Sequence, residues 1–295
     1  MSEFKTYHPI VNFTYFVFAI GFSCFFMHPV CLVFSFVCAF AYSFMQNGRK
    51  AVRFNLVYML PLLILTALIN PAFNHAGITI LTYLPDGNPL TLESVIYGAC
   101  AALMLAGVIC WFSCFGKIMT SDKIIYLFGK VLPSLSLIFS MTLRFVPKFM
   151  SEFKKVANAQ KGIGRDMSSG NIVKRARNGL SMISIITTKA LENAIDTADS
   201  MKSRGYGIPG RSAFSIFRFG KRDLILLVII FIFGIYCLTG GILGAMEFSF
   251  FPMIVSAKFS AYNVSVFAAY FMLCILPVII ELREVRKWNA LRSAI

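Results

Sequence analysis

Six stretches of the chain are long, apolar and free of charged side chains, and they constrain the fold more than any other feature. A helix needs about 20 largely apolar residues to cross the hydrocarbon core of a bilayer. With 58% hydrophobic and only 14% charged residues, the chain does not resemble an ordinary soluble enzyme, because soluble domains carry about 25% charged residues. The stretches therefore predict an all-α polytopic membrane protein with about six transmembrane helices. They lie at Val11–Met27, Pro29–Met45, Phe54–Ile69, Ser94–Phe115, Leu224–Met246 and Asn263–Ile280.

The positive charge of the chain is concentrated in one region. The sequence holds 28 Lys and Arg against 13 Asp and Glu, a net charge of +15. Residues 116–222 carry 19 of these cations and 6 of these acids, a net charge of +13, and the remainder carries 9 and 7, a net charge of +2. This distribution predicts three parts: an N-terminal membrane domain with four spans at 1–115, a basic domain at 116–222, and C-terminal membrane helices with a basic tail at 223–295.

The loops indicate which way the predicted spans run. The loop at 49–53 and the tail at 283–292 are rich in Lys and Arg, whereas Asn70–Leu92 contains neither. Cationic loops stay in the cytoplasm, so we expect the N-terminus inside and the fourth span to return the chain to the cytoplasm before residue 116. A seventh apolar stretch, Ile124–Leu143, would place the following cations outside if it crossed. We therefore expect it to lie against the membrane, in a cytoplasmic basic domain.

The six stretches contain no Asp, Glu, Lys, Arg or His. Ion-coupled transporters and proton relays use such residues inside the membrane, so their absence argues against an ion gradient as the energy source. The sequence also lacks the G-x-x-x-x-G-K-[ST] loop that holds ATP phosphates. All eight cysteines lie in apolar runs, where cysteine behaves as a small hydrophobic residue. We predict no metal and no cofactor bound by this chain itself.

Two long amphipathic helices are predicted in the basic domain. The first begins at Pro133 and ends at Gly162 and Gly164, and Pro147 is expected to bend or interrupt it. The second runs from about Asn171 to Ser203, and its apolar residues recur at steps of three and four, which is typical of one buried stripe. Small residues in that stripe let another helix approach closely. The stripe comprises Val173, Ala176, Leu180, Ile183, Ile186, Ala190, Ala194 and Ala198.

The two helices end alike. Residues 159–165 read AQKGIGR and residues 201–207 read MKSRGYG, so each end offers cations followed by glycine. Glycine is the usual residue just past a helix because it accepts the left-handed conformation, and cations suit the helix dipole there, so capping alone explains either end. Two such ends in one domain instead predict a two-part partner with one groove for each end. Arginine suits such a contact because its planar guanidinium forms several hydrogen bonds at once.

These residues resemble the transmembrane T component of energy-coupling factor (ECF) transporters, relatives of the cobalt-transport permease subunit. The resemblance covers roughly residues 5–245, and its specificity comes mainly from residues 141–207. It is carried by Ser203-Arg204-Gly205 with Tyr206-Gly207, by the sequence MTLRFVP at 141–147, and more weakly by His28-Pro29 and Asn70-Pro71. The family joins a membrane domain to a cytoplasmic coupling domain, in which two helices end in Ala-Arg-Gly-like motifs that dock on two ABC-type ATPases.

The resemblance implies three sets of functional residues. The first ATPase-docking motif comprises Ala159, Gln160, Lys161, Gly162, Gly164 and Arg165. The second comprises Ser203, Arg204 and Gly205. Residues that shape the coupling helices are Arg144, Pro147, Ala190, Ala194 and Ala198. The family commonly reads Ala-Gln-x-x-Arg-Gly in the first motif, and this chain has Ile163 where arginine is expected, so Arg165 or Lys161 is the candidate replacement.

The function that the resemblance implies is energy coupling without catalysis. The chain would transmit motion from two ABC-type ATPases, which bind the ATP, to a small substrate-binding membrane subunit of a micronutrient importer in a prokaryotic cell membrane. The micronutrient would be a vitamin or a metal ion. The last span and tail, Asn263–Ile295, extend beyond the usual end of the family.

Two other interpretations remain open at this point. One is the transmembrane subunit of another class of ABC importer, in which Glu192-Asn193-Ala194 would belong to a single coupling helix. The other is a membrane-embedded lipid or prenyl transferase, in which Glu192, Asp196 and Asp199 would hold a metal ion. On an amphipathic helix such acids more often pair with nearby cations. Anionic lipid head groups are a further partner for the basic domain, and no motif indicates nucleic acid.

Overall fold

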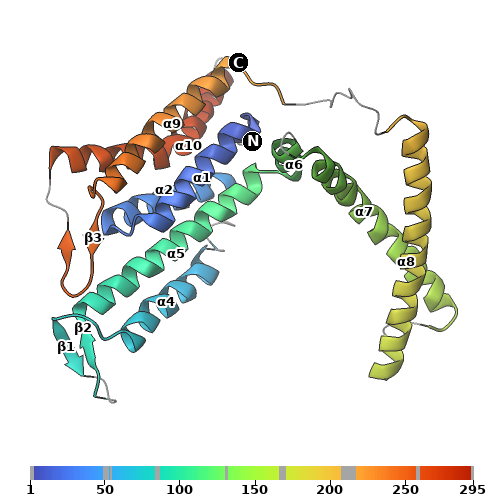
Figure 1. Ribbon diagram of the computed structural model, residues 1–295, viewed down its shortest axis with the longest axis horizontal. Coiled ribbons are helices and arrows are strands. Elements are labelled where there is room, and N and C mark those ends of the chain that lie inside the picture. The colour runs from blue at the N-terminus through green and yellow to red at the C-terminus, as the bar shows by residue number, and fades with distance from the viewer. Residues whose placement is uncertain are drawn as a thin grey trace. The chain divides into compact units, whose positions relative to one another are not determined.

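The computed structural model describes residues 3–48, 53, 55–83, 87–129, 132–165, 171–206, 217–256 and 260–293. These residues form nine α-helices, and the predicted all-α class is confirmed (Figure 1). The chain divides into two compact units, which we call the bundle unit (residues 1–124 and 217–295) and the hairpin unit (residues 125–216). The three-part division at residues 115/116 and 222/223 rests on charge and membrane crossing, and it stays a prediction.

The bundle unit contains six apolar helical segments, one for each charge-free stretch of the sequence. They are α1 (Pro9–Phe25), α2 (Pro29–Asn47), the π-helical turn η2 with α4 (Asn55–Met59 and Leu60–Phe73), α5 (Leu92–Ile118), α9 (Lys221–Ile242) and α10 (Ala261–Ser293). Among the described residues, four helices are long and apolar enough to cross a membrane, namely α2, α5, α9 and α10. The helices α1 and α4 are apolar but shorter, so they need tilt or their flanks to span.

Short elements connect these helices. A 3-10 turn, η1 (Phe4–Thr6), precedes α1, and α6 (Ser121–Gly129) follows α5. Two small antiparallel hairpins were not anticipated: β1 (Ile80–Tyr83) pairs with β2 (Pro89–Thr91), and β3 (Phe248–Ser249) pairs with β4 (Val255–Ser256). The first hairpin lies within the cation-free segment at 70–92, and the second joins α9 to α10.

Helix α5 is the centre of the bundle unit, and it packs against α1, α2 and α4, while α10 packs against α2 and α9 (Figure 1). A fully buried Trp111 on α5 donates a hydrogen bond from its indole Nε1 to Ser35 Oγ on α2, at 2.9 Å. Gly98 lets α4 approach closely, since a Cβ atom at this position would lie 2.7 Å from the Ala67 carbonyl oxygen. Seven of the eight cysteines are buried free thiols.

Histidine side chains begin the first two helices of the bundle. His8 and His28 are the N-cap residues of α1 and α2, and each is followed by proline at the first helical position. Each imidazole accepts a hydrogen bond through Nδ1 from the backbone N–H two residues on, at 3.3 Å in both cases. Proline has no N–H to satisfy there and its φ already suits a helix, so the His-Pro pair is a local start signal.

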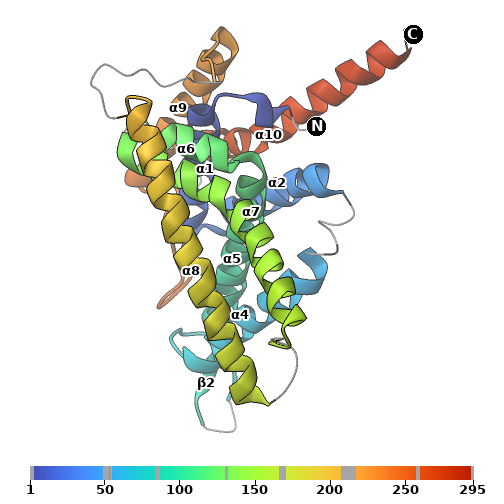
Figure 2. The same cartoon turned by 90° about the vertical axis from the view of Figure 1, so that its right-hand side faces the viewer.

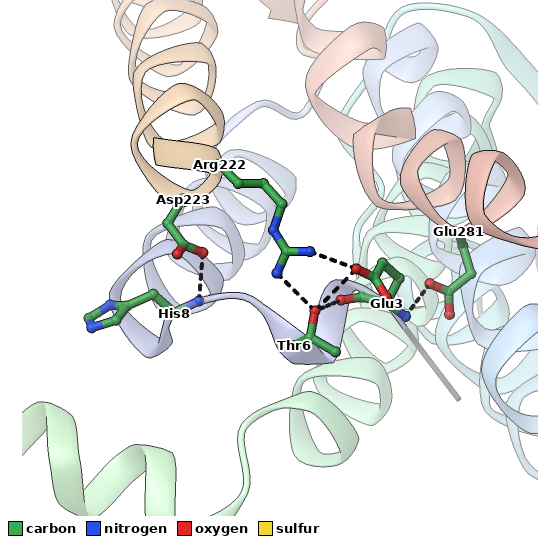
Figure 3. A network of polar contacts seen from close by, with 6 residues as sticks. All are labelled: Glu3, Thr6, His8, Arg222, Asp223 and Glu281. Carbon is green, nitrogen blue, oxygen red and sulfur yellow. Dashed lines mark hydrogen bonds and ion pairs between the residues drawn. The ribbon is translucent and has the colours of Figure 1, made fainter. Parts of the chain in front are cut away.

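Residues 3–8 form a polar network with the start of α9 and with α10 (Figure 3). The Arg222 guanidinium binds Glu3 Oε1 at 2.7 Å and Thr6 Oγ1 at 3.1 Å. The His8 backbone N–H donates to Asp223 Oδ1 at 3.0 Å. The Glu3 backbone N–H donates to Glu281 Oε2, also at 3.0 Å. The chain returns to the bundle unit at Phe217. Residues 3–8 therefore bind the start of α9, just after this point of return.

The same segment holds the point at which the chain leaves the bundle unit. Lys123 on α6 is only 4% exposed, and its Nζ donates to the carbonyl oxygens of Lys5 at 2.6 Å and Tyr7 at 3.3 Å. In the amide orientation that satisfies both of its polar atoms, Asn12 Oδ1 accepts from Lys123 Nζ at 2.6 Å. Burial, and less strongly the neighbouring Lys5, lowers the pKa of Lys123 to about 8. The N-terminal segment thus binds the chain both where it leaves the bundle unit and where it returns to it.

The hairpin unit consists of two long helices, α7 (Pro133–Gly162) and α8 (Ile172–Ser203). They are antiparallel, because Glu152 of α7 forms an ion pair with Lys189 of α8, while Arg144 shares a groove with Arg204. Figure 2 shows the two helices along their length. Glu152 also binds Lys155 at 2.9 Å. The hydrogen bonds from these two lysines lower the pKa of the Glu152 carboxyl to about 2.

Pro147, expected to bend or interrupt α7, does not interrupt it, and the bend stays a prediction. Helix α7 runs through this residue without a break from Pro133 to Gly162. Proline removes one intrahelical hydrogen bond, the one to the carbonyl of residue 143, and crowds the preceding turn. The remaining hydrogen bonds on either side keep a 30-residue helix intact.

Six of the eight members of the predicted buried stripe of α8 are exposed, so α7 does not cover them. Ile186 and Ala190 are half-buried, whereas Val173, Leu180 and Ile183 are 75%, 68% and 58% exposed. The exposed members also include Ala176, Ala194 and Ala198. The covered face instead follows Met182, Ile186, Ala190, Asn193, Thr197 and Met201. At about 100° per residue, it is turned by roughly a quarter of a turn from the predicted stripe, so most of the apolar stripe stays uncovered.

Candidate functional site

The first predicted docking motif lies at the end of α7, and we call residues 159–165 tip 1. Two backbone hydrogen bonds close this helix end. The Gly164 N–H donates to the Lys161 carbonyl at 3.1 Å, and the Arg165 N–H donates to the Gln160 carbonyl at 2.9 Å. Gly164 has a φ of 75°, in the left-handed region that glycine adopts without steric cost. This is a Schellman cap. The predicted helix end at Gly162 and Gly164 is therefore confirmed.

The second predicted docking motif lies at the end of α8, and we call residues 201–206 tip 2. It has the same capping geometry. The Gly205 N–H donates to the Lys202 carbonyl at 3.1 Å, and the Tyr206 N–H donates to the Met201 carbonyl at 3.0 Å. Gly205 has a φ of 74°. Gly207, which continued the sequence match, lies outside the described residues.

The shared caps align the tips residue by residue. Gly164 corresponds to Gly205 and Lys161 to Lys202, and Ser203 corresponds to Gly162. The residue before the left-handed glycine is Ile163 in the first tip and Arg204 in the second.

Tip 1 therefore presents an apolar side chain, 66% exposed, where tip 2 presents a guanidinium. Arg165 lies two positions further along, after the glycine, at the position of Tyr206. Within tip 1, Ala159 and Arg165 are exposed and Gln160 is half-buried.

The two tips lie at opposite ends of the antiparallel hairpin, as both views show (Figures 1 and 2). Helix α7 has 30 residues and α8 has 32. At about 1.5 Å per residue, each helix is roughly 45 Å long. The two tips are therefore separated by roughly the length of one helix.

The structure brings Arg144, predicted only as a residue that shapes the coupling helix, to tip 2. A groove of about 500 Å³ separates the first half of α7 from the second half of α8. Its walls are Met141, Arg144, Phe145, Lys148, Asn193, Asp196, Thr197, Ser200, Met201 and Arg204. Lys148 was not among the predicted residues, although its position four residues after Arg144 places both on one helix face.

The other residues predicted to shape the coupling helices are not gathered at one place. Ala190 lies against α7, in a crevice of about 10 Å³ that Phe149 and Val156 also line. This contact fits the close approach expected of a small residue. Ala194, Ala198 and Pro147 are exposed, and their roles stay predictions.

The metal site considered for a transferase does not form among the described residues, where no three His, Cys, Asp or Glu side chains lie close enough to hold an ion. Of the three acids considered, Asp196 lines the groove, and Glu192 and Asp199 do not.

Comparison with known proteins gives the family. The CbiQ family, described as a cobalt transport protein, matches residues 7–216. This range includes both tips and the groove.

Individual relatives match over shorter segments. The energy-coupling factor transporter transmembrane protein EcfT of Lactobacillus helveticus is 36% identical over 106 residues, covering 36% of this chain and 38% of that protein. The protein of the same name from Lactococcus lactis subsp. cremoris is 34% identical over 99 residues, covering 33% of this chain and 37% of its own length. In Listeria innocua the identity is 32% over 113 residues, covering 38% and 42%.

The chain thus spans less than half the length of each of these relatives. Their names describe transmembrane proteins, in keeping with the apolar helices of the bundle unit, and the chain is a multi-pass membrane protein. The family match covers well over half of the chain, and the chain belongs to the CbiQ cobalt transport protein family.

Proposed function

We propose that the chain is the transmembrane energy-coupling subunit of an ECF-type ABC importer, with no catalytic role of its own. The observation that carries the proposal is the pair of identically capped, cationic helix tips at opposite ends of one antiparallel hairpin. Family membership and relatives named as energy-coupling factor transporter transmembrane proteins support it. Two tips also favour this function over an importer subunit with a single coupling helix.

The partners proposed for the tips are two ABC-type ATPases, one at each tip. The chain has no phosphate-binding loop of its own, so ATP is bound by these partners and energy enters through the tips. Arg204 is the main contact of tip 2, because its guanidinium is exposed and has no hydrogen bond or ion pair to a described residue. In tip 1, Lys161 and Arg165 provide the charge on either side of Ile163.

Closure of the ATPase pair on ATP would shift the two tips relative to each other. A helix is stiff along its axis, so α7 and α8 carry this shift as rigid rods. The Glu152–Lys189 ion pair and the contact around Ala190 hold the rods together where they meet. Displacement at one tip is then converted into rotation of the hairpin.

A small substrate-binding membrane subunit is the proposed recipient of this motion. The uncovered apolar stripe of α8, with Val173, Leu180 and Ile183 more than half exposed, needs an apolar cover of protein or lipid. The subunit would carry the substrate specificity, for a micronutrient such as a vitamin or a metal ion.

The test is assembly and uptake with an Arg204→Glu variant. Tagged chain is purified from its native membrane, and the co-purifying proteins are identified by mass spectrometry, alongside uptake measurements. We expect wild-type chain to retain two ATPases and a small membrane protein, and Arg204→Glu to lose most of the ATPase and the uptake, because a carboxylate replaces the docking cation. Lys154→Glu is the matched control, since Lys154 is an exposed cation of α7 that lies outside both tips and the groove.

The first tip is tested in the same assay with Lys161→Ala and Arg165→Ala. Loss of ATPase with either variant identifies which cation replaces the expected arginine. If Arg204→Glu retains both ATPases and full uptake, the proposed function of tip 2 is wrong.

A further inference from the structure

The groove between α7 and α8 contains three cations from two distant parts of the sequence. Arg144 and Lys148 come from α7, and Arg204 comes from the C-cap of α8. The single acid in its walls is Asp196. Three cations against one acid give the groove a formal net charge of +2.

None of these four charged side chains has a hydrogen bond or ion pair to any described residue. The nearest acid along α7, Glu152, is already bound by Lys155 and Lys189. Lys148 makes only a long contact with a ring, its Nζ lying 6.0 Å from the centre of Phe145. The charges of the groove are thus not neutralised inside the hairpin unit.

Helix capping does not account for these cations either. Basic side chains near a helix end often bind its last free carbonyls. At the end of α8, however, the carbonyls of Ser200, Met201 and Lys202 already accept backbone N–H groups. Arg204 is left free to bind something outside the unit.

We propose that the groove is a continuation of docking tip 2 and receives an acidic segment of the same partner ATPase. The inference rests on the proposed function. Arg204 and Arg144 would each present a planar pair of N–H donors to a carboxylate, and Lys148 would add a point charge beside them. A segment with at least two Asp or Glu side chains would offset the net charge.

The polar wall of the groove suits a peptide better than a bare ion. Asn193, Thr197 and Ser200 line the face opposite the α7 cations. The groove volume of about 500 Å³ admits several side chains. Arg204 belongs both to tip 2 and to the wall of the groove, so a partner that binds tip 2 is also adjacent to the groove.

The experiment measures affinity between the purified ATPase pair and the full chain in nanodiscs of phosphatidylcholine. We expect Arg144→Gln to weaken ATPase binding about tenfold. The double variant Arg144→Gln with Arg204→Gln should weaken binding by less than the product of the two single effects, because two side chains that contact the same ligand segment do not contribute independently. The wild-type affinity should fall more steeply with salt than that of the variant. Arg144→Lys should restore part of the loss.

Lys154→Gln is the matched control, an exposed α7 cation outside the groove. The inference is overturned if Arg144→Gln binds ATPase within about twofold of that control, or if its effect is additive with Arg204→Gln. It is also overturned if Arg144→Gln weakens ATPase binding only when the nanodiscs contain phosphatidylglycerol and not in phosphatidylcholine alone. The groove would then be a lipid head-group site. Should Arg204→Gln itself leave ATPase binding unchanged, the proposed function fails rather than the groove alone.

Discussion

Two cations of the bundle unit and the three cations of the groove in the hairpin unit are the same residue types in opposite situations. Lys123 and Arg222 are bound by carbonyl, hydroxyl and carboxylate groups of residues 3–8. Arg144, Lys148 and Arg204 have no such partner among the described residues. Replacing a satisfied cation leaves its partners unpaired, whereas replacing an unsatisfied one leaves the fold unaffected. The difference separates residues that hold this chain together from residues available to other chains.

The largest expected effect on stability is that of Lys123→Met. It leaves the carbonyls of Lys5 and Tyr7 without their donor in a buried place, and each such acceptor costs about 1–3 kcal/mol. We expect the unfolding temperature in detergent to fall by at least about 4 °C. Buried cysteines make the reaction of a thiol-specific dye a suitable readout.

Arg144→Met is the paired variant, and it should leave the unfolding temperature within about 1 °C of the wild type. Equal losses in the two variants would remove the distinction between the two groups of cations.

A smaller effect is expected from pH. The pKa of Lys123 is lowered from its ordinary value of 10.5 to about 8 in the folded chain. Between these values the unfolded chain binds more protons, so the stability contributed by Lys123 rises with pH in that window and is constant below it. The unfolding temperature of the wild type should rise relative to Lys123→Met between about pH 8 and pH 10. Parallel profiles for the two proteins would contradict the lowered pKa.

The smallest effect is expected from the ion pair between Arg222 and Glu3, because the Arg222 side chain is 54% exposed. Exposed pairs contribute about 0.2–1 kcal/mol. Arg222→Glu should lower the unfolding temperature slightly, and Arg222→Glu with Glu3→Arg should recover part of the loss. Recovery stays partial because the guanidinium also lies 4.3 Å from the centre of the Tyr7 ring. No recovery in the double variant would mean that the pair itself contributes nothing.

The features that depend on a few neighbouring residues, namely the apolar segments and the helix ends, were predictable from the sequence. Runs without charge gave the six apolar segments, and glycine after cations gave both ends of the hairpin helices, since a cap depends on a few neighbouring residues. The covered face of α8 was missed because apolar periodicity marks which side avoids water, and not which side meets α7. A partner or lipid can cover the rest of the stripe.

Contacts between distant residues were not predictable in the same way. Arg144 and Arg204 are 60 positions apart in the numbering and meet only because α7 and α8 are antiparallel. Lys123 lies in an amphipathic stretch with a neighbouring acid, Asp122, which is typical of a solvated surface. Its burial follows from the position of the N-terminal segment, and no local pattern encodes that.

The N-terminal network also bears on how the protein is made. Residues 3–8 leave the ribosome well before Arg222, Asp223 and Glu281, which are synthesised more than 200 residues later. Until then the segment has Lys123 as its partner and lacks the other half of its network. The network therefore becomes complete only after α9 and α10 have been synthesised. All three late partners follow residue 216, where the family match ends, so the network of the N-terminal segment is completed by residues outside the matched range.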